Sequence, residues 1–241
     1  MFNGTVLCVM RNEAIRHAAE YLRGVGICVT EKCAPDVTHL LLPVPSFSAG
    51  DEYLGHLLSK LPDDLIISGG NLDSPLLEGC ACVDFLQDPY YLAENAAITA
   101  RCAVSILEKQ VDPDISGKQT LIIGWGRIGK CLVPLLQDCG ASVTVAARKA
   151  SDLAMIRALG TRSIPTADVP EETARYDIII NTVPVLLFPD IRTKQDAFLL
   201  ELASKPGMTG RNITDGRGLP GKMAPKESGK LIAETFVRLT I

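Results

Sequence analysis

The chain has 241 residues, of which 47% are hydrophobic, and its 24 basic and 28 acidic residues leave a net charge of −4. This length allows one large domain or two modest ones. The sequence has no basic tract, which argues against nucleic acid as a partner, and no apolar run long enough to span a membrane. The N-terminal residues lack the features of a signal peptide, so we expect a cytoplasmic protein.

The eight cysteines show no metal-binding pattern. Cys80 and Cys82 form the only close pair, and alternate positions of a strand point to opposite faces. No CxxC pair or Cys/His cluster has the spacing of a zinc site. We therefore expect no metal and predict reduced cysteines that serve as small core residues.

The first 89 residues alternate between strand and helix patterns, and Asn12 is a candidate helix N-cap. We predict strands over residues 5–10, 27–30, 39–42, 65–68 and 80–85, and helices over residues 12–23 and 51–61. This alternation predicts a small α/β domain with a mostly parallel sheet, Rossmann-like or flavodoxin-like, over residues 1–89. Its first strand–helix turn lacks glycine, so we do not expect it to hold a dinucleotide.

A long helix is predicted over residues 90–110, directly after Asp88-Pro89. Its apolar residues recur at helical spacing, and we expect it to bridge two domains and to form one wall of the cleft between them. Residues 111–225 then form a predicted dinucleotide-binding domain. The last helix, over residues 226–241, fits against either domain.

A glycine motif lies near the centre of the chain, in the stretch TLIIGWGRIGK of residues 120–130. A short apolar strand precedes Gly124-x-Gly126-x-x-Gly129, and a helix from Lys130 and a second strand over 142–146 follow it, which is the context of a dinucleotide site. The first glycine makes a tight turn, the second lets a pyrophosphate approach, and the third lets the helix pack closely. The helix N-terminus attracts phosphate. The expected cofactor ligands here are Gly124, Trp125, Gly126, Arg127, Ile128 and Gly129. The alternative is a glycine-rich turn without a ligand.

The end of the second strand indicates which dinucleotide is bound. NAD-binding domains usually place an acidic residue there to hold the ribose hydroxyl groups. This chain has Ala147, Arg148 and Lys149 instead, and Arg binds phosphate through paired N–H donors. The segment therefore favours NADP over NAD. In the alternative interpretation these cations are the solvated start of a helix capped by Ser151.

The remaining strands are predicted over residues 163–164, 177–182 and 198–203. Together with the glycine motif they indicate an α/β fold whose C-terminal domain is a Rossmann domain with a doubly wound parallel sheet. In such a sheet the end of the fourth strand lies beside the nicotinamide half of the cofactor. The expected contacts there are Asn181, Thr182, Val183 and Pro184.

Several motifs resemble those of the dipicolinate synthase A-subunit family, whose Rossmann domain is related to the D-2-hydroxyacid dehydrogenases. The most specific are the segments ASKPG and GLPGKMAPK. The similar segments cover residues 41–43, 94–100, 121–130, 177–184, 202–207 and 218–226. The chain departs from the family in its first turn, which lacks glycines, and at Ile98, Arg101 and Cys102.

The resemblance implies an NADP-dependent enzyme of spore-forming bacteria. It implies oxidation of a dihydrodipicolinate-type precursor to pyridine-2,6-dicarboxylate, with the flavoprotein B subunit of the synthase as partner. We expect a small dicarboxylate substrate and a homo-oligomer such as a dimer.

Few residues are suited to the chemistry. The three histidines, His17, His39 and His56, all precede the glycine motif, which argues against the His-centred mechanism of the hydroxyacid dehydrogenases. Loss of a hydride that makes the product aromatic needs only a modest base. We expect Asn95, Thr99 and Lys205 to be the catalytic and substrate-binding residues. Asn95 and Thr99 share one helix face, and Lys205 follows a strand. Each also has a purely structural interpretation.

Lys226 and the turn at residues 218–221 are further candidates for the substrate site, because they could close over the substrate. Two other functions stay open. The chain is alternatively a catalytically idle NAD(P)-binding sensor or partner subunit, or a dehydrogenase for another small carboxylic acid.

Overall fold

The computed structural model describes residues 2–46, 52–62, 64–189, 191–210 and 212–241. The chain divides into two compact units. Unit 1 comprises Met1–Asn95 and Pro220–Ile241, and unit 2 comprises Ala96–Leu219. Each unit contains one parallel sheet, so the predicted α/β class is confirmed.

The sheet of unit 1 has the strand order β2-β1-β3-β4-β5, with every described pairing parallel. Its strands are β1 (Thr5–Cys8), β2 (Cys28–Thr30), β3 (Val37–Leu41), β4 (Ile66–Gly69) and β5 (Ala81–Asp84). This is the flavodoxin-like order, in which the chain reverses its direction of winding between the first and third strands. The flavodoxin-like prediction for this unit is therefore confirmed.

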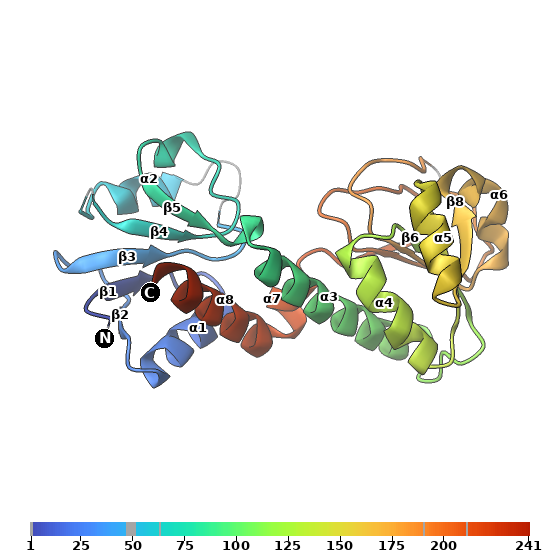
Figure 1. Ribbon diagram of the computed structural model, residues 1–241, viewed down its shortest axis with the longest axis horizontal. Helices are drawn as coiled ribbons and strands as arrows, with labels where there is room; N and C mark the ends of the chain where they lie inside the picture. The colour runs from blue at the N-terminus through green and yellow to red at the C-terminus, as the bar shows by residue number, and fades with distance from the viewer. Residues whose placement is uncertain (1, 47–51, 63, 190, 211) are drawn as a thin grey trace. The chain divides into compact units, whose positions relative to one another are not determined.

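Helices cover both faces of this sheet (Figure 1). α1 (Glu13–Gly24) and α8 (Pro225–Thr240) cover one face, and α2 (Glu52–Leu58) covers the other. Side chains alternate between the two cores because successive strand residues point to opposite faces. Val6 and Cys8 pack with α1 and α8, whereas Leu7 and Val9 pack with α2. Two 3-10 turns, η1 (Pro75–Leu77) and η2 (Phe85–Gln87), flank β5.

Asn12 caps α1 as predicted, because its side-chain oxygen accepts a hydrogen bond from the Ile15 N–H at 3.0 Å. Among the described residues α2 begins at Glu52, and the predicted helix start at Asp51 lies outside them. α3 (Pro89–Gln110) contributes residues to both units, since the boundary falls between Asn95 and Ala96.

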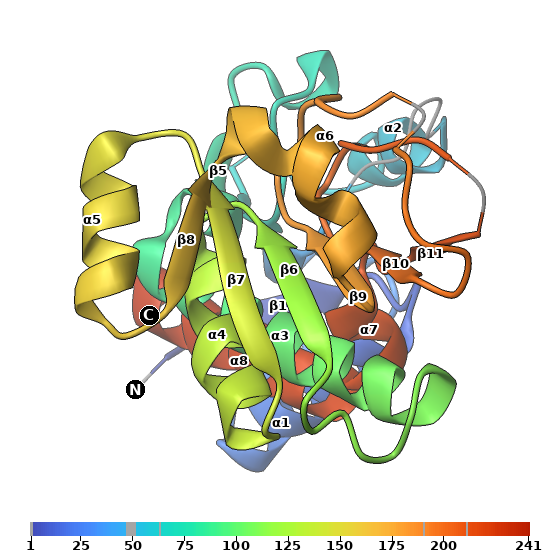
Figure 2. The ribbon, with the colours of Figure 1, turned by 90° about the vertical axis from the view of Figure 1, so that its right-hand side faces the viewer.

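Unit 2 contains a sheet of order β11-β10-β9-β6-β7-β8, again parallel throughout its described pairings (Figure 2). Its strands are β6 (Gln119–Ile123), β7 (Ser142–Ala147), β8 (Arg162–Pro165), β9 (Ile178–Asn181), β10 (Phe198–Glu201) and β11 (Ile213–Asp215). Numbered from β6, the order is 3-2-1-4-5-6, the Rossmann arrangement, with its switch point between β6 and β9. The predicted Rossmann sheet is confirmed, and β11 adds an edge strand that the sequence pattern did not indicate.

Helices lie on both faces of the second sheet, as a doubly wound fold requires. The helical elements are α4 (Arg127–Asp138), α5 (Ala150–Ala158), η3 (Thr166–Asp168), α6 (Val169–Glu172) and η4 (Thr173–Arg175). Gly129 of α4 lies against the side chain of Ile122. Val169 of α6 packs with Leu121 and Ile123 on the opposite face.

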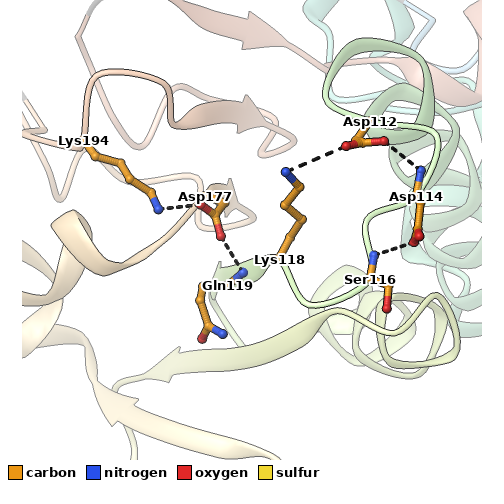
Figure 3. Close-up of polar contacts among 7 residues, drawn as sticks. All are labelled: Asp112, Asp114, Ser116, Lys118, Gln119, Asp177 and Lys194. Atoms are coloured by element: carbon orange, nitrogen blue, oxygen red, sulfur yellow. Dashed lines mark hydrogen bonds and ion pairs between the residues drawn. The ribbon is translucent and has the colours of Figure 1, made fainter.

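Polar contacts join the amino ends of β6 and β9 (Figure 3). Asp177 accepts a hydrogen bond from the Gln119 N–H at 2.8 Å and pairs with Lys194. The Lys194 ammonium beside Asp177 holds the pKa of that carboxyl below its usual value. Asp112 and Asp114 cap successive turns of the loop that leads into β6. These contacts fasten the loop before β6 and the segment around Lys194 to the amino ends of the two central strands.

Three local predictions are wrong. Ser151 does not cap α5, because the helix begins at Ala150 with Lys149 in the N-cap position. Residues 219–221 belong to a short helix, α7 (Leu219–Met223), rather than to a turn. Only some cysteines are core residues, since Cys8 and Cys102 are buried but Cys28, Cys33 and Cys82 are exposed.

None of the helices in the described ranges combines the length and apolarity that a membrane span requires.

Candidate functional site

The glycine turn lies at the carboxyl end of β6, and its glycines differ in what surrounds them. At Gly124, where φ is +108°, a Cβ atom would lie 2.4 Å from Oγ1 of Thr182. At Gly129 it would lie 2.3 Å from the carbonyl oxygen of Gly124. At Gly126 nothing lies within 4 Å of the Cβ position. Two glycines therefore allow tight packing, and the middle one borders open space.

The N-terminus of α4 points its backbone N–H groups to this space. Gly126 is the N-cap and has no side chain to accept a hydrogen bond, and the first N–H groups of any helix lack intrahelical acceptors. The dipole of the helix favours an anion there. Of the other residues in the turn, Arg127 is exposed, and Trp125 and Ile128 are half-buried. The Lys130 ammonium lies 5.9 Å from the centre of the Trp125 ring.

The carboxyl end of β7 lies next to the turn, because the Gly124 N–H donates to the Ala146 carbonyl at 2.9 Å. Ala147, the last residue of β7, is buried. Arg148 and Lys149 follow it, and both are exposed. Two cations therefore lie at the same edge of the sheet as the glycine turn, where the adenosine ribose is held in a Rossmann fold.

On its other side the turn is flanked by the end of β9. The backbone N–H and the hydroxyl of Thr182 both donate to the Ile123 carbonyl, each at 2.9 Å. Val183 is half-buried and Pro184 is exposed. The structure thus brings the predicted segments 124–129 and 181–184 together at the switch point of the sheet.

A buried carboxylate that the sequence interpretation missed lies beneath this edge. Glu201, the last residue of β10, is 3% exposed, and Asn181 is fully buried. The Asn181 side-chain amide donates to both carboxylate oxygens, at 2.8 and 3.0 Å. The available signal was a single charged residue at the end of the apolar run Phe-Leu-Leu-Glu, since Glu is rarely buried unless it is paired.

The Glu201 carboxylate also orders the loop that follows β10. It accepts hydrogen bonds from the N–H groups of Ala203 and Gly207, each at 2.9 Å, and of Met208 at 3.3 Å. Gly207 must be glycine here, because a Cβ atom would lie 2.3 Å from both the Asn181 amide nitrogen and the Val183 carbonyl oxygen. The ASKPG segment is therefore fixed against the end of β9 by hydrogen bonds to a buried charge.

Lys205 projects from this loop and is exposed, and it makes no ion pair with any described residue. Asn95 and Thr99 lie one turn apart on α3, where Asn95 is half-buried and Thr99 is 5% exposed. Lys226 is in the first turn of α8 and lines a cavity with His17 and Glu20 of α1. The structure thus places Lys205 at the edge of the sheet that carries the glycine turn.

A cavity of about 250 Å³ adjoins the ends of β10 and β11. Glu201, Thr209, Asp215 and Arg217 contribute to its lining. The Arg217 guanidinium is held by the Asp215 carboxylate through two hydrogen bonds of 2.8 and 2.7 Å.

Across the described ranges, no three His, Cys, Asp or Glu side chains are grouped as a metal site requires.

Comparisons with known proteins agree with this geometry, although no protein-family profile matches the sequence. The chain is 29% identical over 156 residues to the A subunit of dipicolinate synthase from Bacillus subtilis, an alignment that covers 60% of this chain and 52% of that protein. It is also 27% identical over 136 residues to shikimate dehydrogenase (NADP(+)) of Shouchella clausii, covering 48% of this chain and 50% of the relative.

Among solved structures, the A subunit of dipicolinate synthase from Bacillus halodurans matches with a TM-score of 0.84 and 22% identity. That match covers 98% of this chain and 97% of the solved chain, and it establishes a shared fold. The chain aligns with about half the length of the curated relatives named here. The predicted resemblance to the A subunit of dipicolinate synthase is thereby confirmed, and the relatives include dehydrogenases.

Proposed function

We propose that the chain is an oxidoreductase that binds a nicotinamide dinucleotide, prefers NADP(H) to NAD(H), and acts on a small dicarboxylate of the dipicolinate type. The observation that carries the proposal is the open space at Gly126, bordered by two glycines that close packing requires. A turn with only a structural role needs Gly124 and Gly129, but it has no need of a bare backbone at Gly126.

The pyrophosphate would bind the backbone N–H groups at the start of α4, between Gly126 and Gly129. Asn181 and Thr182 would flank the nicotinamide half from the end of β9, supported from below by Glu201. When bound, the nicotinamide supplies a hydride acceptor or donor. The protein holds the cofactor in place and positions the substrate.

The preference for NADP(H) rests on Arg148 and Lys149. Both are exposed at the end of β7, and no acidic side chain follows that strand directly. A guanidinium matches the geometry of phosphate oxygens, so a 2′-phosphate would gain charge-assisted hydrogen bonds. The name of the shikimate dehydrogenase relative includes NADP(+), which is consistent with this assignment.

The substrate assignment rests on the resemblance to the A subunit of dipicolinate synthase. In this proposal Lys205 of unit 2 binds a substrate carboxylate. The roles in substrate binding that we expect for Asn95 and Thr99 stay predictions. The partner would be the flavoprotein B subunit of such a synthase. The residues beyond His56 include no histidine, so the proton would leave to water or to a modest base when the product becomes aromatic.

The test is a titration of the purified protein with NADPH and NADH, followed by energy transfer from Trp125. This is the single tryptophan of the chain, and it lies within the glycine turn. We expect NADPH to bind more tightly than NADH. Arg148→Asp should weaken NADPH binding by about 10- to 100-fold, the effect of losing charge-assisted hydrogen bonds, and leave NADH binding nearly unchanged.

Arg175→Asp is the matched control, because it makes the same change of charge before β9, at the opposite end of the strands. Equal losses for NADPH and NADH in Arg148→Asp would remove Arg148 from the 2′-phosphate. Binding of neither nucleotide by the unsubstituted protein would overturn the proposal. Tight NADPH binding without turnover of any pyridine dicarboxylate precursor, with or without a flavoprotein, would favour a catalytically idle NADP-binding protein.

A further inference from the structure

Glu201 is a buried carboxylate at the end of β10, and hydrogen-bond donors surround it. One carboxylate oxygen accepts from the Asn181 side-chain amide at 2.8 Å and from the Ala203 N–H at 2.9 Å. The other accepts from the same amide at 3.0 Å, from the Gly207 N–H at 2.9 Å and from the Met208 N–H at 3.3 Å. A protonated carboxyl or an amide would place a donor against these donors. The cluster therefore requires an ionised carboxylate.

The Asn181 side chain passes this restraint to the backbone that follows β9. Its amide nitrogen also donates to the Val183 carbonyl at 3.0 Å, and its oxygen accepts from the Val183 N–H at 3.1 Å. Val183 in turn lies against the glycine turn, since a Cβ atom at Gly124 would be 2.8 Å from its side chain. Asn181 thus acts on this segment from within the protein, by fixing its backbone.

The segment after β9 and the loop after β10 are packed against each other. A Cβ atom at Gly207 would lie 2.3 Å from the Val183 carbonyl oxygen and 3.0 Å from that of Val185. The Leu187 N–H donates to the Gly207 carbonyl at 2.9 Å. Lys205 projects from the loop after β10 and is exposed. One carboxylate therefore holds two segments that border the proposed site.

We propose that Glu201 is a positioning residue that couples the two halves of this site. Through Asn181 it fixes the backbone of residues 182–184, which would flank the nicotinamide. Through the backbone N–H groups that it accepts from, it fixes the loop that carries Lys205 toward the substrate. This inference rests on the function proposed for unit 2. Because both segments share one carboxylate, a nicotinamide that orders the first should also order the second.

The test compares NADPH with 2′-phospho-ADP-ribose, which keeps the adenosine, the 2′-phosphate and the pyrophosphate but has no nicotinamide. Isothermal titration calorimetry of the full chain measures both affinities. Glu201→Gln keeps the size of the side chain and replaces an acceptor with a donor. We expect it to weaken NADPH about tenfold or more and to leave 2′-phospho-ADP-ribose nearly unchanged. A general loss of structure would weaken both ligands alike.

Glu172→Gln is the matched control, because it makes the same substitution at a carboxylate that pairs with Arg162 and Arg175 before the start of β9. Both affinities should match those of the unsubstituted protein. Glu201→Asp keeps the charge on a shorter side chain, so it should restore part of the affinity for NADPH. Circular dichroism checks the fold of each variant.

Hydrogen–deuterium exchange of the unsubstituted chain tests the same coupling without any substitution, and it decides the matter if Glu201→Gln does not fold. Both ligands should slow exchange over residues 124–130, because both carry the pyrophosphate. NADPH alone should slow exchange over residues 202–208, whose N–H groups include those that donate to Glu201. Exchange reports local opening of such hydrogen bonds.

Unchanged NADPH affinity in Glu201→Gln, equal losses for the two ligands, or equal protection of residues 202–208 by both would overturn the positioning role. Each of these results would leave the dinucleotide site in place. Binding of neither ligand by the unsubstituted protein would instead remove the function proposed for unit 2, and the role of Glu201 with it.

Discussion

At the scale of single residues, the glycines of the turn differ in whether close packing or open space explains the absence of a side chain. A methyl group at Gly126 meets no atom within 4 Å, whereas at Gly129 it meets the Gly124 carbonyl at 2.3 Å. The backbone at Gly126, with φ −80° and ψ −168°, is extended and suits alanine. The two positions therefore have different physical reasons for being glycine.

We predict that Gly126→Ala leaves the melting temperature almost unchanged and abolishes detectable binding of NADPH, because the methyl group fills the space that a pyrophosphate needs. Gly129→Ala should lower stability by about 1–3 kcal/mol, the usual cost of forced overpacking. Calorimetry and the Trp125 titration measure the two quantities separately. Full NADPH binding by Gly126→Ala would contradict the placement of the pyrophosphate.

The residues of the candidate site were only partly predictable from sequence. Gly124, Gly126 and Gly129 are recognisable because their spacing carries the geometry of the turn. Glu201 is not, because its role depends on N–H groups at Ala203 and Gly207 that the loop brings back to it. Hydrogen bonds of this kind leave no periodic pattern in the chain.

At the scale of elements, α1 and α8 pack closely through small residues. A Cβ atom at Gly229 would lie 2.4 Å from the Ala14 carbonyl oxygen and 2.9 Å from the Ala18 nitrogen, both backbone atoms that cannot move aside cheaply. Ala233 of α8 and Ala14 of α1 are also buried in this core. Residues without bulky side chains thus set the separation of the two helices.

We predict that Gly229→Ala destabilises unit 1 by about 1–3 kcal/mol, because the clash outweighs the gain of about 1 kcal/mol in helix propensity. Gly24→Ala, at the last residue of α1, is the matched control, since nothing lies within 4 Å of its Cβ position. It should be neutral or slightly stabilising. Urea unfolding measures both, and equal effects at the two positions would argue against close packing at Gly229.

Element boundaries show where sequence patterns lose their predictive power. The apolar strands β6, β9 and β10 were predicted because each is a run that can only be buried. β11 was missed because Ile-Thr-Asp is short and largely polar, and its pairing with β10 comes from tertiary context. α7 was missed because Gly-Leu-Pro-Gly suggests a turn, although proline is well tolerated in the first turn of a helix.

At the scale of the whole molecule, an ion pair joins residues 150 positions apart in unit 1. Asp88 precedes α3 and accepts two hydrogen bonds from Arg238 of α8, at 3.0 and 2.6 Å, and one from the Tyr91 N–H at 2.6 Å. Asp88 is 9% exposed. The hydrogen bonds from Arg238 lower the pKa of the Asp88 carboxyl, against the opposing effect of burial.

A carboxyl with a lowered pKa in the folded state stabilises the fold above its unfolded pKa of about 3.9. That contribution is lost as the pH falls through the lower folded pKa. We predict that Asp88→Asn lowers stability by about 1–2 kcal/mol at neutral pH, and that the difference from the unsubstituted protein shrinks below about pH 4. Thermal unfolding between neutral pH and about pH 3 tests this. Glu13→Gln, in an exposed pair with Arg16, should show little difference at any pH.

Unit 1 is built from two stretches of sequence, and unit 2 lies between them along the chain. During synthesis every residue of unit 2 therefore leaves the ribosome before α8 does, and domains generally fold as they emerge. The apolar face of α1 can be buried only after α8 has been synthesised, because the two helices pack in the same core. Unit 2 can therefore fold while unit 1 is still incomplete, so a stalled or shortened chain would keep the glycine turn and leave the apolar face of α1 uncovered.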